Sequence, residues 1–362
     1  MARFRVGYQI HPQHCTIDQI RDAYRNADSL GVDVLYVWDH MYPLYGDPEG
    51  AHYASTPILA GMAVETKQAQ FGTLVSSVAY RNPEFYAYEV WTMNKISHGR
   101  AILGIGAGWF ERDYNEFGYE FGDAPARLRE LGRALPRITE RLGKLDAAHG
   151  DGKIPIMIGG AGEKVTLKLT AQYADLWNTF PPVDSWKHKN DVLDEWCAKV
   201  GRDPKAIERT CSVNADKLGV VDELLAAGAQ QLIIRGAQPF DMKPVEELLK
   251  LSGRSRGQPP RRLGRHSPTG WGSKTCLVAR ARLARPTPKQ GLPPHSWGGG
   301  AAKRRRRAFT DRLRQGSILA KARPLVSWQD TSNQDTSTSS VLPVGRNNAR
   351  TRAMSTATPG GR

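Results

Sequence analysis

The sequence of 362 residues is poor in the features that build metal centres, disulfide frameworks and membrane spans. Its four cysteines are scattered and form no CxxC pair, so neither a disulfide framework nor a zinc site is indicated. The HExxH pair of metalloproteases and the GxSxG motif of acyl-transferring hydrolases are both absent. No run of about 18 apolar residues occurs, and the N-terminus shows no apolar segment with a cleavage site, so a cytoplasmic protein is expected.

Acidic residues are nearly missing from the last third of the chain. Residues 253–362 contain 23 Lys and Arg but only 3 Asp and Glu, whereas residues 1–252 contain 28 basic and 33 acidic residues. Because the basic segment is rich in Arg, Pro, Gly, Ser and Thr without periodic apolar positions, we predict one domain over 1–252 and a disordered tail over 253–362. The run KRRRR at 303–307 leaves nucleic-acid binding open. Translation of GC-rich DNA in a shifted or read-through frame would give the same composition, and we prefer that interpretation.

Strand-like apolar runs alternate with amphipathic segments over the first 251 residues. Several runs are apolar throughout, as expected for a parallel sheet covered on both faces. A capping box at Thr16–Gln19 opens the first helix, and Pro136 is expected to interrupt the fourth. The eight strand–helix pairs predict a single (β/α)8 TIM barrel, with a doubly wound open sheet as the alternative. The strand-like runs cover residues 4–10, 32–38, 69–77, 101–108, 154–160, 174–180, 208–214 and 230–236.

The candidate site lies where these strands end, because catalytic groups of a barrel gather at the carboxyl ends of its strands. Asp39 and His40 end the second strand, and an ionisable pair at that place predicts a functional role. The segment GIGAGWFERDY (104–114) follows the fourth strand, and its glycines allow a flat ligand or a phosphate to approach the backbone. It is not the dinucleotide fingerprint, because Trp109 stands where the third glycine is required.

A second glycine-rich turn, IGGAGEKVTLKL (158–169), leads from the fifth strand into a helix. Free N–H groups at that helix N-terminus, together with the helix dipole, predict a site for one phosphate. The turn is not a P-loop, because Glu163 precedes Lys164 and Val165 follows it. Each glycine cluster alone would indicate only a tight turn. Together the two clusters predict a phosphorylated, planar cofactor across the end of the barrel.

Four motifs in this order resemble the bacterial luciferase-like superfamily of flavin and deazaflavin enzymes, in particular its actinobacterial branch of oxidoreductases dependent on coenzyme F420. They are YVWDHMYPLYGDPEG, GTLVSSVAYRNP, ISHGRAILGIGAGWFERDYNEFGYEFG and IPIMIGGAGEKVTLKL. The resemblance covers essentially residues 3–251. It implies a (β/α)8 barrel with the cofactor ring at its carboxyl end, which agrees with the count of eight units.

The resemblance also implies roles for particular residues. It implies a cis peptide near Leu74-Val75, with Ser76 beside it, that supports the cofactor ring. It further places Asp39 against the cofactor, Gly106, Ala107 and Gly108 along it, and Gly159, Gly160 and Ala161 at its phosphate. In the similar sugar-phosphate dehydrogenases, a His at the position of His40 acts as the base with Trp and Glu partners. Those partner positions hold Leu44 and Trp109 here, which argues against glucose 6-phosphate and leaves Glu111 as a replacement carboxylate.

The expected function is hydride transfer between a small organic substrate and coenzyme F420, with His40 as general acid and base. An imidazole suits this role because its ordinary pKa lies near working pH. An FMN-dependent monooxygenase on the same barrel is the enzymatic alternative, since both cofactors carry a tricyclic ring and a phosphate. A nucleic-acid-binding protein acting through the basic tail is the alternative from another class. A membrane partner is not expected, and a homodimer is left open.

Overall fold

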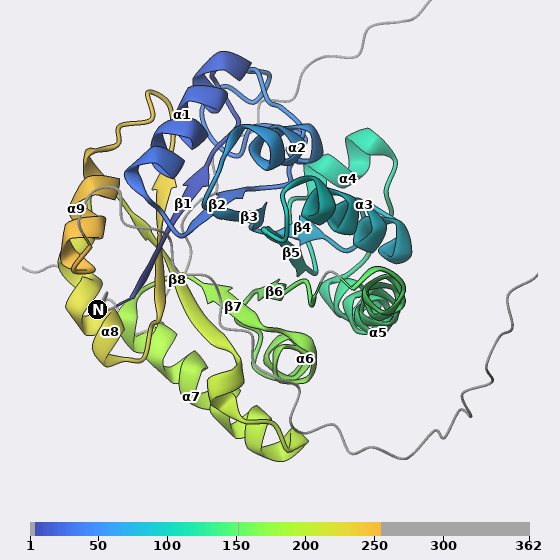
Figure 1. Ribbon diagram of the computed structural model, residues 1–362. Helices are drawn as coiled ribbons and strands as arrows, with labels where there is room; N and C mark the ends of the chain where they lie inside the picture. Colours follow the sequence, from blue (N-terminus) through green and yellow to red (C-terminus); the bar gives the residue numbers. More distant parts are fainter. Residues whose placement is uncertain (1–3, 151, 255–362) are drawn as a thin grey trace, which may run out of the picture. The chain divides into compact units, whose positions relative to one another are not determined.

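The computed structural model describes residues 4–150 and 152–254, and these form a closed barrel of parallel strands surrounded by helices (Figure 1). Neighbouring strands pair in parallel around the ring. Both β3 and β4 pair with β5, and β9 pairs with β1 to close the ring. This confirms the predicted (β/α)8 barrel and excludes the open sheet. The strands are β1 (Arg5–Ile10), β2 (Val34–Val37), β3 (Gln70–Thr73), β4 (Ser76–Ser77), β5 (Ala101–Gly106), β6 (Ile156–Gly159), β7 (Leu176–Thr179), β8 (Glu208–Asn214) and β9 (Gln231–Gly236).

The helices form the outer layer around the strands, and strands and helices alternate along most of the chain (Figure 1). The capping box at Thr16 and Gln19 is present and opens α1. The α-helices are α1 (Ile17–Leu30), α2 (Ser55–Glu65), α3 (Pro83–Ile96), α4 (Glu111–Phe117), α5 (Ala124–His149), α6 (Thr166–Tyr173), α7 (Val183–Val200), α8 (Val221–Ala226) and α9 (Lys243–Leu251). Short 3-10 helices occupy Pro204–Ala206 and Leu218–Val220.

Four local features differ from what the sequence indicated. Helix α5 runs through Pro136 without a break, because a buried apolar stripe on both sides of the proline holds it against the barrel. The third strand is divided into β3 and β4 by a cis peptide between Leu74 and Val75. Helix α4 was not expected, and α6 begins only at Thr166, several residues beyond the glycine-rich turn.

The core has two layers, as a barrel requires. A large cluster fills the space between strands and helices, and a small one fills the inside of the ring. Because side chains alternate along a strand, residues two positions beyond the inner cluster face inward at the carboxyl end. The inward-facing residues at the carboxyl ends of the strands therefore surround one common region, and the candidate site lies there. The inner cluster consists of Val34, Tyr36, Leu74, Ile102, Met157, Leu176 and Ile233.

The folded domain includes at least two residues beyond the predicted boundary at 252. Arg254 is buried and forms an ion pair of 2.8 Å with Asp33, whose side chain is fully buried. The predicted tail lies outside the described residues from 255 onward, so its disorder and any nucleic-acid binding stay predictions. We propose that residues 1–254 form the complete folding unit.

Truncation at two points tests this boundary. A chain ending after residue 254 should unfold at the same temperature as the full chain. A chain ending after residue 252 should lose about 3 kcal/mol of unfolding free energy, because Asp33 then lacks the guanidinium that faces it. Arg254→Met in the full chain is the matched control and should show the same loss in chemical denaturation. Equal stability of both truncated chains would contradict the proposal.

Candidate active site

His40 and Asp113 form a hydrogen-bonded pair at the carboxyl end of the barrel. His40 follows β2, and its Nδ1 lies 2.8 Å from Oδ2 of Asp113 in the first turn of α4. The Asp113 side chain is fully buried, whereas 11% of the His40 side chain is exposed. The pair therefore joins a buried carboxylate to an imidazole that reaches the surface of the site.

The surroundings of Asp113 fix the orientation of the imidazole. Its Oδ1 accepts hydrogen bonds from the backbone N–H groups of Met41 and Tyr42, each at 3.1 Å. Its Oδ2 also accepts from the hydroxyl of Tyr80 at 2.9 Å, and burial followed by the charge of Asp113 raises the pKa of that phenol. Because a carboxylate can only accept hydrogen bonds, Asp113 favours the tautomer of His40 in which Nδ1 carries the proton and donates it to Oδ2. The Nε2 atom of His40 then keeps its lone pair on the opposite side of the ring.

Aromatic rings enclose His40. The centroids of Trp109 and Phe110 lie 5.6 and 5.5 Å from the centroid of its ring, and that of Trp38 lies at 6.1 Å. Trp109 remains 62% exposed, whereas Trp38 is buried. An exposed aromatic ring beside a partly exposed imidazole offers an apolar surface for an organic ligand.

The carboxylate of Asp39 is hydrogen-bonded by neighbouring side chains of the protein. Its carboxylate accepts hydrogen bonds from the hydroxyls of Ser55 and Ser76, both at 2.5 Å, and pairs with Arg81 through both oxygens. Burial opposes ionisation of Asp39, but the charge and hydrogen bonds of Arg81 and the two serines outweigh it and lower the pKa of the carboxyl. Asp39 therefore ties β2 to the start of α2 and to β4, and its contact with a cofactor stays a prediction.

The cis peptide implied by the resemblance is present between Leu74 and Val75. The amide of Gln9 on β1 donates to the carbonyl of Leu74 at 3.0 Å. The side chain of Val75 packs against Gly106 and Gly159, where an added Cβ would come within 2.9 and 2.8 Å of it. These two glycines thus make room for Val75, which forms an apolar platform at the end of the barrel.

The side chains around residue 108 leave room only for glycine. Its φ is +80°, and an added Cβ would lie 1.9 Å from the Tyr114 hydroxyl and 2.3 Å from Oγ of Ser77. Those two hydroxyls are themselves 2.5 Å apart. Ala107 is partly buried beside the main core. The glycine-rich segment after β5 is therefore shaped by internal packing, and a role along a cofactor stays a prediction.

The predicted phosphate turn differs from the expectation in one respect. The N–H of Gly160 donates to the carbonyl of Asn178 at 3.0 Å, so it belongs to the sheet rather than to a helix N-terminus. The carbonyl of Gly160 accepts from the indole of Trp177 at 2.8 Å. The turn then continues from Ala161 to the start of α6 at Thr166. Backbone donors for an anion would have to come from Ala161 onward.

Glu111 lies in the first turn of α4 and is exposed, and the carboxylate that bonds His40 is its neighbour Asp113. Sequence reasoning did not identify Asp113 as the partner of His40. Nor did it identify Tyr80 and Arg81, although both lie in the motif GTLVSSVAYRNP at the end of the third strand. A polar or charged run at a strand end is the signal that could have indicated them.

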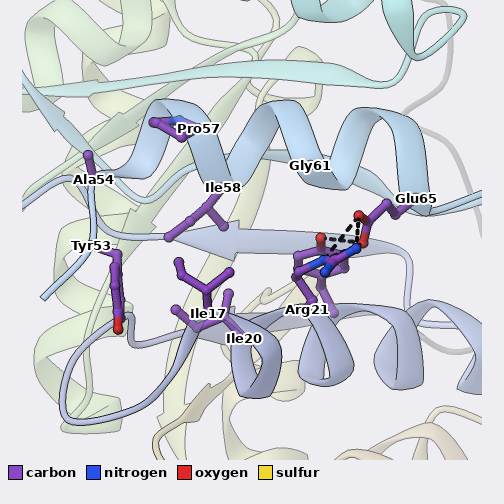
Figure 2. Close-up of a pocket in the computed structure, with 10 residues that line it drawn as sticks. Ile17, Ile20, Arg21, Tyr53, Ala54, Pro57, Ile58, Gly61 and Glu65 are labelled. Atoms are coloured by element: carbon purple, nitrogen blue, oxygen red, sulfur yellow. Dashed lines mark hydrogen bonds and ion pairs between the residues drawn. The ribbon is translucent and has the colours of Figure 1, made fainter. Parts of the chain in front are cut away.

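A groove of about 290 Å³ lies elsewhere, between α1 and α2 on the outer layer (Figure 2). Ile17, Ile20 and Ile58 line it, and at one end Arg21 pairs with Glu65 at 2.8 Å (Figure 2). None of the candidate site residues borders it, so it is separate from the end of the barrel. In the ranges that the structure describes, no group of three metal-ligating side chains gathers, and no helix could cross a membrane.

The family model described as luciferase-like monooxygenase matches residues 1–243 of the chain. The chain belongs to this luciferase-like family. Its relatives include a 5,10-methylenetetrahydromethanopterin reductase of Archaeoglobus fulgidus, 31% identical over 211 residues that cover 53% of this chain and 58% of the relative. An F420-dependent glucose-6-phosphate dehydrogenase of Microbacterium testaceum is 26% identical over 218 residues, covering 55% and 64%. The chain thus spans less than two thirds of either relative.

Two solved structures share the barrel fold at low sequence identity. An F420-dependent secondary alcohol dehydrogenase, in complex with an F420-acetone adduct, superimposes with a TM-score of 0.61 at 16% identity, covering 70% of this chain and 99% of that one. The oxygenating constituent of 3,6-diketocamphane monooxygenase from Pseudomonas putida, in complex with FMN, gives 0.53 at 16% identity, covering 69% and 97%. Both likenesses confirm the barrel fold.

Proposed function

We propose that this luciferase-like protein is an oxidoreductase that transfers a hydride between coenzyme F420 and a small organic substrate. The observation that carries the proposal is the His40–Asp113 pair, a buried carboxylate that orients a partly exposed imidazole at the carboxyl end of the barrel. Relatives named for F420 or for a methanopterin reductase support the cofactor, and the structural neighbour named for an F420-acetone adduct agrees with it.

The residues at the end of the barrel fit a planar ring. Val75 offers an apolar platform, and the neighbouring Gly106 and Gly159 lack side chains that would cover it. Trp109 supplies an exposed aromatic surface near His40. When bound there, a deazaflavin would supply the hydride chemistry. The protein would bind and orient it and keep water from the reacting atoms.

His40 would move the proton that accompanies the hydride. As an alcohol carbon loses its hydride, Nε2 of His40 accepts the hydroxyl proton and a carbonyl forms. In the reverse direction, Nε2 returns that proton to the carbonyl oxygen. The Asp113 carboxylate stabilises the imidazolium in either direction through Nδ1, and the hydroxyl of Tyr80 helps to hold Asp113 in place. His40 is thus the catalytic residue of the proposal and Asp113 a positioning residue.

An FMN-dependent monooxygenase is the second candidate, favoured by the FMN-bound neighbour from Pseudomonas putida. Calorimetric titration of the full-length protein with F420, and separately with FMN, distinguishes the two candidate functions. We expect a dissociation constant at least about tenfold lower for F420, which corresponds to about 1.4 kcal/mol. Tighter binding of FMN would favour the monooxygenase. Binding of neither would contradict the enzymatic proposal.

The cofactor phosphate is proposed to bind at the turn from Ala161 to Thr166, beside the glycines of β6. Ala161→Asp places a carboxylate next to these backbone donors, so it should weaken F420 binding by about 10-fold or more through repulsion between like charges. Ala161→Asn has the same shape without the charge and should bind nearly normally. Equal F420 affinity of the two variants, measured by calorimetry, would show that the cofactor phosphate does not bind at this turn.

A further inference from the structure

Arg235 is a cation that faces inward at the end of β9. Along this strand, Gln231 bonds the hydroxyl of Tyr36 inside the ring at 3.0 Å, and Ile233 belongs to the inner cluster. Arg235 is the next residue on the same side, so its side chain lies on the inner wall at the carboxyl end. It is partly exposed there.

The partners of Arg235 are neutral. Its guanidinium donates to Oδ1 of Asn214 on β8 at 3.0 Å, and its carbon lies 5.6 Å from the ring of Phe180, which follows β7. Within residues 4–150 and 152–254, no carboxylate lies at ion-pair distance from it. A partly buried guanidinium without an anion is suited to bind one, and carboxylate is its natural bidentate ligand.

A second polar group on the same wall lacks a partner. His11 follows β1, the neighbour of β9, and is 3% exposed. Its Nδ1 is bonded to the hydroxyl of Tyr45 at 2.6 Å, whereas its Nε2 has no hydrogen-bond partner among the described residues. Burial and then the charge of Arg235 lower the pKa of His11 to about 3. His11 is therefore neutral and leaves the charge of Arg235 uncompensated.

The position of this wall relates it to the candidate active site. In the ring of eight, β9 lies opposite β5, whose Gly106 borders the Val75 platform, and two strands from β2, which leads to His40. A substrate whose reacting end lies beside His40 would extend its other end toward Arg235, two strands away, and would leave the Val75 platform to the cofactor ring. One positive charge matches a monoanion such as carboxylate better than a phosphate dianion.

We infer that Arg235, with Asn214 and His11 beside it, binds the carboxylate of a substrate that carries its reacting alcohol or carbonyl at the other end. The substrate class is then a short hydroxy or oxo acid. This inference rests on the proposed function, because it assumes that a substrate reacts beside His40. The Asn214 amide, which accepts from Arg235, keeps its NH2 group as a further donor.

Calorimetry on the full-length protein tests the inference with linear oxo acids of three to eight carbons and their methyl esters. We expect at least one acid to bind about 10- to 100-fold more tightly than its ester, the size of a charge-assisted hydrogen-bonded contact. Arg235→Met should abolish this preference and leave binding of the ester unchanged. Asn214→Asp should abolish it too, because the new carboxylate has the same shape as the amide and pairs with Arg235 in place. Asn214→Asp keeps the test decisive should Arg235→Met fail to fold.

Equal binding of every acid and its ester by the wild-type protein, or no binding of any acid, would overturn the inference. A loss of F420 or FMN affinity in Arg235→Met, with the preference for acids intact, would overturn it as well and assign Arg235 to the cofactor. The parallel cofactor titration keeps the two proposals apart. A preference for acids without cofactor affinity would refute the oxidoreductase and keep the carboxylate site. Cofactor affinity without that preference would refute only the carboxylate site.

Discussion

His40→Ala should lower turnover by about 10²- to 10⁴-fold and leave the affinity for F420 nearly unchanged, as expected for the loss of a general acid and base. Nε2 of His40 is the atom that would exchange the proton, and alanine offers no replacement. The folded state should survive, because the His40 side chain is partly exposed and bonds only one side chain among the described residues, Asp113. Turnover is measured with the substrate, and cofactor affinity by calorimetry.

Two variants sharpen this result. His149→Ala, in the last turn of α5, removes an imidazole far along the chain from the site and should leave turnover unchanged. Asp113→Asn keeps the shape of the side chain but can present its NH2 group to Nδ1, which would favour the wrong tautomer of His40. It should lower turnover and change the pH profile with cofactor affinity intact. Full turnover in His40→Ala would show that His40 has no catalytic role. Glu111 would then be the next candidate for the general base.

Asp39→Ala should lower the free energy of unfolding by about 3 to 5 kcal/mol, because it removes the carboxylate that pairs with Arg81 through both oxygens and leaves that guanidinium only Glu89, at 3.5 Å, among the described carboxylates. The side chains of Asp39 and Arg81 are 5% and 19% exposed, so solvent replaces little of the lost interaction. The double variant Asp39→Ala with Arg81→Met should recover part of the loss. Chemical denaturation measures all three proteins. An Asp39→Ala protein of normal stability that binds F420 weakly would restore the cofactor contact as the main role of Asp39.

The same pair predicts how stability depends on pH. Because the folded state lowers the pKa of Asp39, the pair contributes fully above the ordinary pKa of Asp, about 3.9, and less as the pH falls through the folded value. The difference in unfolding free energy between wild type and Asp39→Ala should therefore shrink as the pH is lowered from about 7 to 3. A constant difference over this range would show that Asp39 stabilises the fold without its charge.

The barrel could be predicted from sequence because its strands are apolar on both faces and each is followed by a helix. The strand end at Asp39 and His40 was predictable for the same reason. The partner of His40 was not, since Glu111 and Asp113 share the first turn of one short helix. Asp113 is selected by hydrogen bonds from Met41, Tyr42 and Tyr80, which lie far from it in the chain.

The glycines show a second limit of sequence reasoning. Gly106 and Gly159 indicated close approach by a ligand, but in the structure they first accommodate the side chain of Val75. Gly108 likewise makes room for Tyr114 and Ser77. Such contacts join residues far apart in the chain, and one sequence does not contain them. Pro136 failed as a helix breaker for a similar reason, because burial of the apolar stripe of α5 outweighs one lost hydrogen bond.

The central claim is that this barrel holds a deazaflavin and uses it for hydride transfer. The most direct measurement is the absorbance and mass of the cofactor that co-purifies with the full-length protein from a host that makes both F420 and FMN. The account predicts a bound deazaflavin with the mass of F420 and no stoichiometric FMN. Stoichiometric FMN in place of F420 would contradict it.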